Sequence, residues 1–179
     1  MKIIETDRLI LRTWKDEDAD ALWHINQDSK VTEFLLGSMT MEKVKEFIQV
    51  CNESFEAEQF CFFATEVKAT SDLIGFIGLN RIKWEAHFTP AIEIAWRLGS
   101  QYWNKGYAQE GAKAVLDYGF NKIGLCEIVS FTIPDNARSV RVMEKIGMRR
   151  DLQGDFINPQ RIGHPVVKPS VLYKKASAS

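Results

Sequence analysis

The chain has few cysteines, and none of the three lies at the spacing of a metal site. Cys51, Cys61 and Cys126 are isolated in mainly apolar surroundings, with no histidine or second cysteine within four residues. This scarcity excludes a zinc finger and a disulfide-stapled secreted fold. We therefore expect three core thiols in a reducing cytoplasm, and no metal ion.

Long apolar runs and a large excess of charge of one sign are also missing. No segment approaches the roughly 18 consecutive apolar residues of a membrane span, and the N-terminus carries a charge every few residues instead of a signal-peptide core. Lysine and arginine together number 23 and aspartate and glutamate 24, a formal net charge of −1. Since this balance gives no long-range attraction for nucleic acid or anionic lipid, we expect no nucleic-acid and no membrane partner.

What the sequence does contain is typical of one soluble domain. Its 179 residues are 45% hydrophobic and 26% charged, which suffices for a sizeable core. We place a single domain at residues 1–176 and expect residues 177–179, the end of an Ala-Ser-Ala-Ser tail, to fray.

The spacing of the apolar residues predicts a mixed α/β fold. In chain order it indicates a strand at 9–12, helices from about residues 18 and 40, strands at 60–67, 73–82 and 91–98, a helix from 108, a strand at 127–133, a helix ended by Gly147 and a strand at 170–173. The three middle strands form an antiparallel meander, and the helix from 108 crosses over to a parallel strand. Residues 152–169 are predicted to form a long loop, which we expect over the functional site.

The most informative stretch lies between the strand at 91–98 and the helix that follows it. Residues 103–108, Trp-Asn-Lys-Gly-Tyr-Ala, connect a strand end to a helix N-terminus, where backbone N–H groups lack partners and the helix dipole is positive. Gly106 lets the main chain approach a ligand without a Cβ in the way, and Lys105 adds a cation at the rim. The pattern favours an anion site, with a tight turn that binds no ligand as the alternative.

Several motifs, in order along the chain, resemble those of a known enzyme family. They lie at residues 6–12, 93–98, 103–108, 133–139 and 144–148. In this order and spacing they are similar to the acetyl-CoA motifs of the GNAT acetyltransferases, most closely those of the RimJ/RimL-like branch. The resemblance implies the GNAT fold, an α/β fold with a mostly antiparallel central sheet that is splayed at the acetyl-CoA strand and has helices on both faces.

The resemblance also implies acetyl-CoA as the co-substrate and assigns residues to it. In the family the CoA pyrophosphate lies on the loop that corresponds to Trp103, Asn104, Lys105, Gly106, Tyr107 and Ala108. The residues matching Trp96 and Leu98 hydrogen-bond the pantetheine arm through their backbone, and the asparagine matching Asn136 reaches it near the sulfur. Asn136 is equally a favoured helix N-cap, which needs no ligand. Trp103 departs from the family's usual Gln or Arg, so the anion contacts fall to the backbone, Asn104 and Lys105.

Glu93 and Ser139 are the candidate catalytic residues. Glu93 is a carboxylate in a mostly apolar strand and matches the family's general base; an ion pair with Arg97 on the same strand face is the alternative. Many members use a tyrosine to protonate the leaving thiolate, but this sequence has Met143 there. Ser139 is the substitute candidate, against water or a simple hydrogen bond in the first helical turn.

Together these features predict transfer of the acetyl group of acetyl-CoA to a primary amine by direct attack. The acceptor is either a protein N-terminal α-amine or a small amine. The acidic helix start at Asp16, Glu17 and Asp18 either attracts a cationic acceptor or is a solvated face. Because Met143 replaces the tyrosine, a non-catalytic acyl-CoA-binding or interaction module is the alternative function, and a homodimer stays open.

Overall fold

The computed structural model describes residues 1–162 and 167–177. The strands are β1 (Lys2–Glu5), β2 (Leu9–Arg12), β3 (Phe62–Val67), β4 (Leu73–Arg81), β5 (Ile92–Leu98), β6 (Glu127–Thr132), β7 (Arg149–Phe156) and β8 (Ser170–Ala176). The α-helices are α1 (Asp18–Gln27), α2 (Ser29–Thr32), α3 (Met41–Glu58), α4 (Tyr107–Asp117) and α5 (Ala137–Lys145). Shorter helical segments lie at η1 (Ser100–Tyr102), η2 (Tyr118–Ile123) and η3 (Pro159–Arg161).

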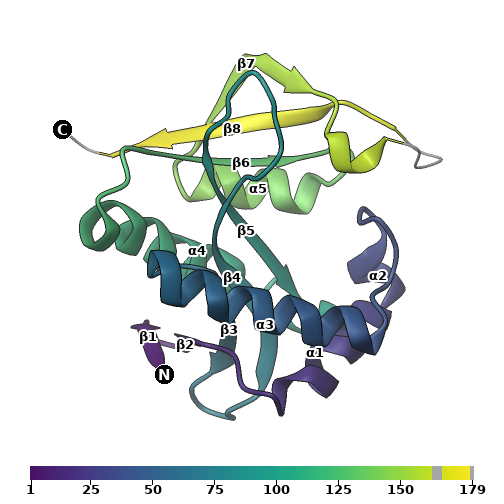
Figure 1. The fold of residues 1–179 in the computed structure, drawn as a ribbon, viewed down its shortest axis with the longest axis vertical. Helices are drawn as coiled ribbons and strands as arrows, with labels where there is room; N and C mark the ends of the chain where they lie inside the picture. Colours follow the sequence, from purple (N-terminus) through teal and green to yellow (C-terminus); the bar gives the residue numbers. More distant parts are fainter. Residues whose placement is uncertain (163–166, 178–179) are drawn as a thin grey trace.

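The strands form one sheet in the order β1-β2-β3-β4-β5-β6-β8-β7. Neighbouring strands are antiparallel except β5 and β6, which run parallel and share a single registered pair, Glu93 with Val129. The rest of β5, toward Leu98, has no partner on β6, so the sheet is splayed there. Figure 1 shows the consequence: β6, β8 and β7 lie apart from β1 to β4, with β5 between the two groups. The predicted mostly antiparallel, splayed sheet is therefore confirmed.

Helices cover both faces of this sheet. Neighbouring residues of a strand point to opposite faces, and on β4 the ring of Phe76 lies 5.2 Å from that of Phe47 on α3. On the other face, a Cβ added to Gly111 of α4 would lie 2.4 Å from Cδ1 of Ile77. The helix α3, together with α1 that packs against it, thus covers one face, and the small residues of α4 allow it to lie close on the other.

The structure corrects the prediction in the C-terminal region and at one thiol. Residues 152–169 do not form one long loop, because Arg149–Phe156 is an edge strand paired with β8. The sequence also does not predict β1 or α2, since four residues are too few for a periodic signal. Cys51 and Cys61 are buried as predicted, whereas Cys126 is exposed and is not a core thiol.

The C-terminal tail is fixed at its first residue. The backbone N–H of Ser177 donates to the carbonyl of Cys126 at 2.9 Å. Residues 178–179 of the predicted frayed tail, and residues 163–166 of the predicted loop, lie outside the described residues. In the described part of the chain, no helix is both long and apolar enough to cross a membrane.

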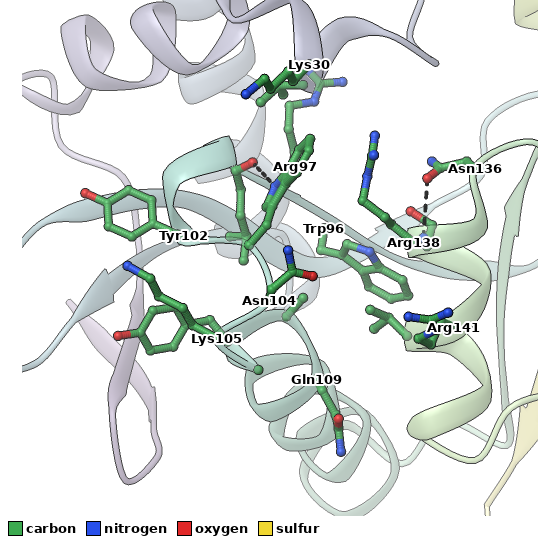
Figure 2. Close-up of a pocket in the computed structure, with 18 of the residues that line it drawn as sticks. Lys30, Trp96, Arg97, Tyr102, Asn104, Lys105, Gln109, Asn136, Arg138 and Arg141 are labelled. Carbon is green, nitrogen blue, oxygen red and sulfur yellow. Dashed lines mark hydrogen bonds between the residues drawn. The ribbon is translucent and has the colours of Figure 1, made fainter.

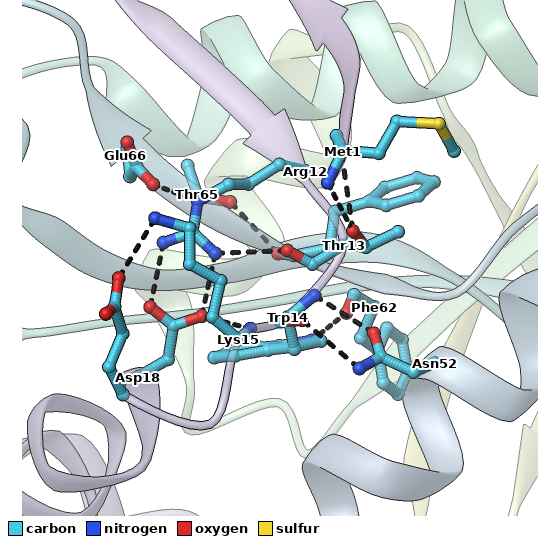
Figure 3. Close-up of polar contacts among 12 residues, drawn as sticks. Met1, Arg12, Thr13, Trp14, Lys15, Asp18, Asn52, Phe62, Thr65 and Glu66 are labelled. Carbon is cyan, nitrogen blue, oxygen red and sulfur yellow. Dashed lines mark hydrogen bonds and ion pairs between the residues drawn. The ribbon is translucent and has the colours of Figure 1, made fainter.

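A buried ion-pair cluster fixes the start of α1 (Figure 3). Arg12, at the end of β2, donates to both carboxylate oxygens of Asp18, at 2.7 and 2.8 Å, and pairs with Glu66 of β3. Asp18 also accepts from the backbone N–H of Lys15 at 2.7 Å. Because Asp18 is buried against Arg12, this residue of the acidic helix start is structural and is not available to a cationic acceptor.

Replacing Asp18 with asparagine is expected to lower the free energy of unfolding by about 2 kcal/mol, because two charge-assisted hydrogen bonds to a buried guanidinium become weaker or are lost. Urea denaturation followed by circular dichroism measures the change. Asp16→Asn alters an exposed carboxylate two residues away and is the matched control. We expect it to change stability by less than about 0.5 kcal/mol. Equal stability of the two variants would contradict the structural role of Asp18.

Candidate functional site

A cavity of about 540 Å³ opens between the C-terminal end of β5, the N-termini of α4 and α5, and α2 (Figure 2). It is lined by every residue that the sequence assigns to the cofactor, namely Trp96, Leu98, Trp103, Asn104, Lys105, Gly106, Tyr107, Ala108 and Asn136. Ser139 lines it as well, whereas Glu93 does not. The fold thus brings a strand end, a loop and a second helix N-terminus to one cavity.

The loop before α4, residues 103–108 and here called the anion-binding loop, has a row of free backbone donors. The N–H of Trp103 donates to the carbonyl of Ser100 at 3.2 Å, and that of Glu110 donates to the carbonyl of Gly106 at 3.0 Å. Between these two, the N–H groups of residues 104–109 have no acceptor among the described residues. Free donors at a helix N-terminus are the usual partners of a bound anion.

Two left-handed residues give the anion-binding loop its shape. Asn104 has a φ of 60° and Gly106 a φ of 82°. A Cβ added to Gly106 would lie 3.3 Å from Nη2 of Arg8, a residue that does not line the cavity. The glycine is therefore favoured for its left-handed backbone, and the close approach of a ligand at this residue stays a prediction.

The cavity lining contains six cationic side chains and, among the described residues, no carboxylate. The cations are Lys30, Arg97, Lys105, Arg138, Arg141 and Lys145. Of these six, only Lys105 is predicted from the sequence to lie at the anion site. Arg138, Arg141 and Lys145 follow one another at three- and four-residue spacing, so they share one face of α5, and this spacing is a signal that the sequence carries. Figure 2 shows Arg138 and Arg141 on the side of α5 that faces Trp96.

Trp103, the departure from the family pattern, joins three parts of the site. Its indole Nε1 donates to the carbonyl of Leu98 at 2.8 Å, which ties the anion-binding loop to β5. The guanidinium of Arg138 lies 4.4 Å from the centre of the indole ring and forms an ion pair with Glu33 at 2.9 Å. Trp103 thus supports a cation at the cavity without contributing a charge itself. The backbone roles of Trp96 and Leu98 toward pantetheine stay predictions.

Glu93 lies on β5, three residues before Trp96 of the cavity lining and at the point where β5 and β6 separate, and is half-buried. Its carboxylate accepts a hydrogen bond from Nδ2 of Asn80 at 3.0 Å. Burial raises the pKa of Glu93 above its usual value, although the bond from Asn80 acts in the opposite direction. The alternative prediction, an ion pair with Arg97, is wrong: Arg97 donates to Asn26 of α1 and lies over the ring of Phe76. Burial lowers the pKa of Arg97 to about 10.

Asn136 and Ser139 lie together at the start of α5. Asn136 caps the helix, since its Oδ1 accepts from the backbone N–H of Ser139 at 3.3 Å and its Nδ2 donates to Oγ1 of Thr132 at 3.2 Å. The capping alternative is therefore realised, and both residues also line the cavity. Met143, where many relatives carry the tyrosine, is fully buried in the core. The roles of Asn136 and Ser139 toward a ligand stay predictions.

Chemically, the arrangement is suited to a polyanion. Free N–H groups and flexible cations face the same space, which is the electrostatic requirement for binding several phosphates. Within residues 1–162 and 167–177, no three side chains of histidine, cysteine, aspartate or glutamate gather into a group that could hold a metal ion.

Several proteins that resemble this chain in sequence or fold are named as acetyltransferases. The family model for the acetyltransferase (GNAT) domain matches residues 8–149. The uncharacterised N-acetyltransferase YnaD of Bacillus subtilis is 36% identical over 149 residues, 83% of each chain. The crystal structure of a GNAT-family acetyltransferase from Bacillus anthracis matches with a TM-score of 0.78 at 31% identity, over 97% of each chain. The aminoglycoside acetyltransferase AAC(6')-Ib in complex with coenzyme A shares the fold, with a TM-score of 0.74 at 21% identity over 94% of each chain.

Proposed function

The chain belongs to the GNAT acetyltransferase family, and on that premise we propose that it transfers the acetyl group of acetyl-CoA to a primary amine. The observation that carries the proposal is the cavity, where a helix N-terminus with free N–H groups shares the lining with six cations and no carboxylate among the described residues. Such a lining suits a ligand with several phosphates, as CoA is.

The residues present fit CoA part by part. Its pyrophosphate would be held by the N–H groups of the anion-binding loop, with Lys105, Arg138 and Arg141 as counter-charges. Its pantetheine arm would run along β5 at Trp96, where β6 has separated and leaves the strand edge unpaired, and would bind there as an added strand does. The thioester would then lie toward Glu93.

Glu93 is the proposed general base. An amine must be neutral to attack, and at pH 7 about a tenth of an α-amine with a pKa near 8 is neutral, against roughly one in 2,500 for a lysine-like amine. A base therefore contributes more for the second class. Burial raises the pKa of Glu93 and so brings it nearer the pH at which a base is most effective. Because Glu93 does not line the cavity, we expect it to act through a bridging water.

Ser139 is the proposed proton donor to the departing thiolate. It is the hydroxyl that the sequence offers as a substitute for the family's tyrosine, and it lines the cavity. We propose direct transfer without an acetylated cysteine. Cys51 and Cys61 are buried, and burial raises the pKa of Cys51 to about 12 and raises that of Cys61 as well. Neither thiol is then ionised at neutral pH, and an un-ionised thiol is a poor nucleophile.

The acceptor is proposed to be a protein N-terminal α-amine or a small amine. Membership of the RimJ/RimL-like branch and a cytoplasmic location stay predictions from the sequence, and homodimer formation stays open. The rival function, an acyl-CoA-binding module without turnover, has one argument in its favour: Met143 is buried in the core and supplies no proton.

Release of free CoA thiol from acetyl-CoA tests the proposal, with peptide N-termini, lysine, polyamines and aminoglycosides as acceptors. We expect turnover with one class of amine, and an increase in melting temperature when acetyl-CoA alone is added. Stabilisation without turnover on the whole panel would favour the binding module. If saturating acetyl-CoA gave no stabilisation, the proposed function would be wrong.

A further inference from the structure

Arg8 contacts the anion-binding loop from outside the cavity. It lies in the turn between β1 and β2, 97 residues before Lys105, and is not part of the cavity lining. Its Nη1 donates to the carbonyl of Lys105 at 2.9 Å, and its guanidinium carbon lies 4.7 Å from the centre of the Tyr107 ring. Its Nη2 is the group that a Cβ on Gly106 would meet. Lys105 and Tyr107 of the loop are therefore both in contact with one side chain, which also lies beside the position that a Cβ on Gly106 would take.

The same guanidinium is fixed by the first turn of α4. Nε of Arg8 donates to Oε2 of Glu110 at 2.6 Å, and the backbone N–H of Arg8 donates to Oε1 of the same carboxylate at 2.9 Å. Thr6 adds a third bond, from its Oγ1 to Oε1 of Glu110 at 2.6 Å. Burial raises the pKa of Glu110, but the hydrogen bonds from Thr6 and Arg8 outweigh it and leave the pKa below its usual value. Glu110 is thus an ionised, oriented anchor at neutral pH.

The bond to Lys105 occupies a carbonyl that lies next to the row of free donors. If α4 began one residue earlier, the carbonyl of Lys105 would accept from the N–H of Gln109, the residue four positions later. In the structure that carbonyl accepts from Arg8, and the N–H of Gln109 has no acceptor among the described residues. Arg8 therefore satisfies a carbonyl that would otherwise remove one donor from the row.

We propose that Arg8, anchored by Glu110 and Thr6, is a positioning residue that holds the anion-binding loop open toward the phosphates of CoA. This role rests on the proposed function. It also gives a purpose to the motif at residues 6–12, whose last residue, Arg12, anchors α1 while Thr6 and Arg8 anchor the loop. Arg8 acts through the geometry of the backbone and not as a charge in contact with the ligand.

Calorimetric titration with CoA measures the effect, because it needs no acceptor and no turnover. We expect Arg8→Ala to raise the Kd for CoA about tenfold, the loss of one strong charge-assisted contact. Arg8→Lys should lose a similar amount, since one ammonium cannot reach Glu110 and the Lys105 carbonyl in the same fork. The turnover number at saturating acetyl-CoA and amine should change less than about twofold, because the reacting groups are untouched.

Glu110→Gln separates positioning from charge, because the two models predict opposite signs. It removes a negative charge near an anion site, so through-space attraction predicts tighter binding. The positioning model predicts a Kd for CoA raised about three- to fivefold, because Arg8 loses its ionised anchor. Arg81→Ala is the matched control: Arg81 forms a comparably exposed ion pair with Glu58 and does not line the cavity. It should leave the Kd unchanged.

Several results would overturn the positioning role. These are unchanged CoA affinity in Arg8→Ala, wild-type affinity in Arg8→Lys, or unchanged or tighter binding in Glu110→Gln. A loss in Arg8→Ala that disappears with 3'-dephospho-CoA would show direct contact with the 3'-phosphate and would also overturn it. If the wild-type chain did not bind CoA, the proposed function itself would fail, which is a distinguishable result.

Discussion

Gly106→Val is expected to weaken CoA binding by about 100-fold or more while the protein stays folded. A β-branched residue is strongly disfavoured at the φ of 82° that Gly106 adopts, a penalty of roughly 1–2 kcal/mol or more, so the loop must change its backbone to relieve it. That change reorients the free N–H groups, each worth about 1.5–3 kcal/mol against a charged partner. At their lower limits the two effects amount to about 2.5 kcal/mol, or roughly 60- to 70-fold in Kd, and anything above those limits brings the loss to about 100-fold or more.

Gly124→Val provides a matched control for this experiment. Gly124 ends η2 with a φ of 80°, and a Cβ added there would meet no described heavy atom within 4 Å. The substitution therefore imposes the same backbone strain at a residue that does not line the cavity. Both variants should lose similar stability in thermal denaturation, and only Gly106→Val should lose CoA affinity in calorimetric titration. Equal affinities would show that the left-handed loop is not the anion site.

Glu93→Gln is expected to reduce turnover by about 100-fold or more with an amine of high pKa, as general bases commonly contribute 10²- to 10⁴-fold. The ratio of wild-type to variant turnover should fall as the pH drops through the raised pKa of Glu93, because protonated glutamate and glutamine then act alike. Taking the ratio removes the pH dependence of the amine itself. Initial rates from pH 5 to 8 at saturating acetyl-CoA measure it.

Stability distinguishes a base from a structural carboxylate at this position. A folded-state pKa above the unfolded value means that stability is lost as the pH rises from about 4.5 through the raised pKa of Glu93. Glutamine removes that loss, so Glu93→Gln should not be less stable than the wild type at neutral pH. Glu127→Gln, an exposed carboxylate on β6, is the control and should keep full turnover. Normal turnover in Glu93→Gln would end its assignment as base.

The sequence predicts the fold well wherever an element is long or bounded by a cap. The helix α3 begins after Thr40, whose side chain accepts from the N–H of Lys43, and its apolar spacing is clear over 18 residues. The edge strand β7 escapes prediction because its burial does not alternate: Leu152 is exposed and Gly154 is buried. An edge strand paired on one side leaves a weak pattern.

The same contrast holds for the site. Gly106 and its neighbours are predictable because a glycine between a strand and a helix is a local signal. That Glu93 and Arg97 do not pair with each other cannot be predicted from the sequence. Their partners are Asn80 of β4 and Asn26 of α1, which reach β5 only in the folded chain. The contact of Arg8 with the anion-binding loop likewise cannot be predicted from the sequence, because its partner Glu110 is 102 residues away in the chain. Local motifs can be read from one sequence, while pairings across the fold cannot.

The single bridge between β5 and β6 has a consequence for how the protein responds to a ligand. The anion-binding loop and α4 belong to the half that contains β1 to β5, whereas Arg138 and Arg141 belong to the half that contains β6, β7 and β8. One hydrophobic core runs through both halves and holds them together where the backbone pairing is sparse. A ligand that contacts both halves is therefore expected to add a second link across the junction between β5 and β6.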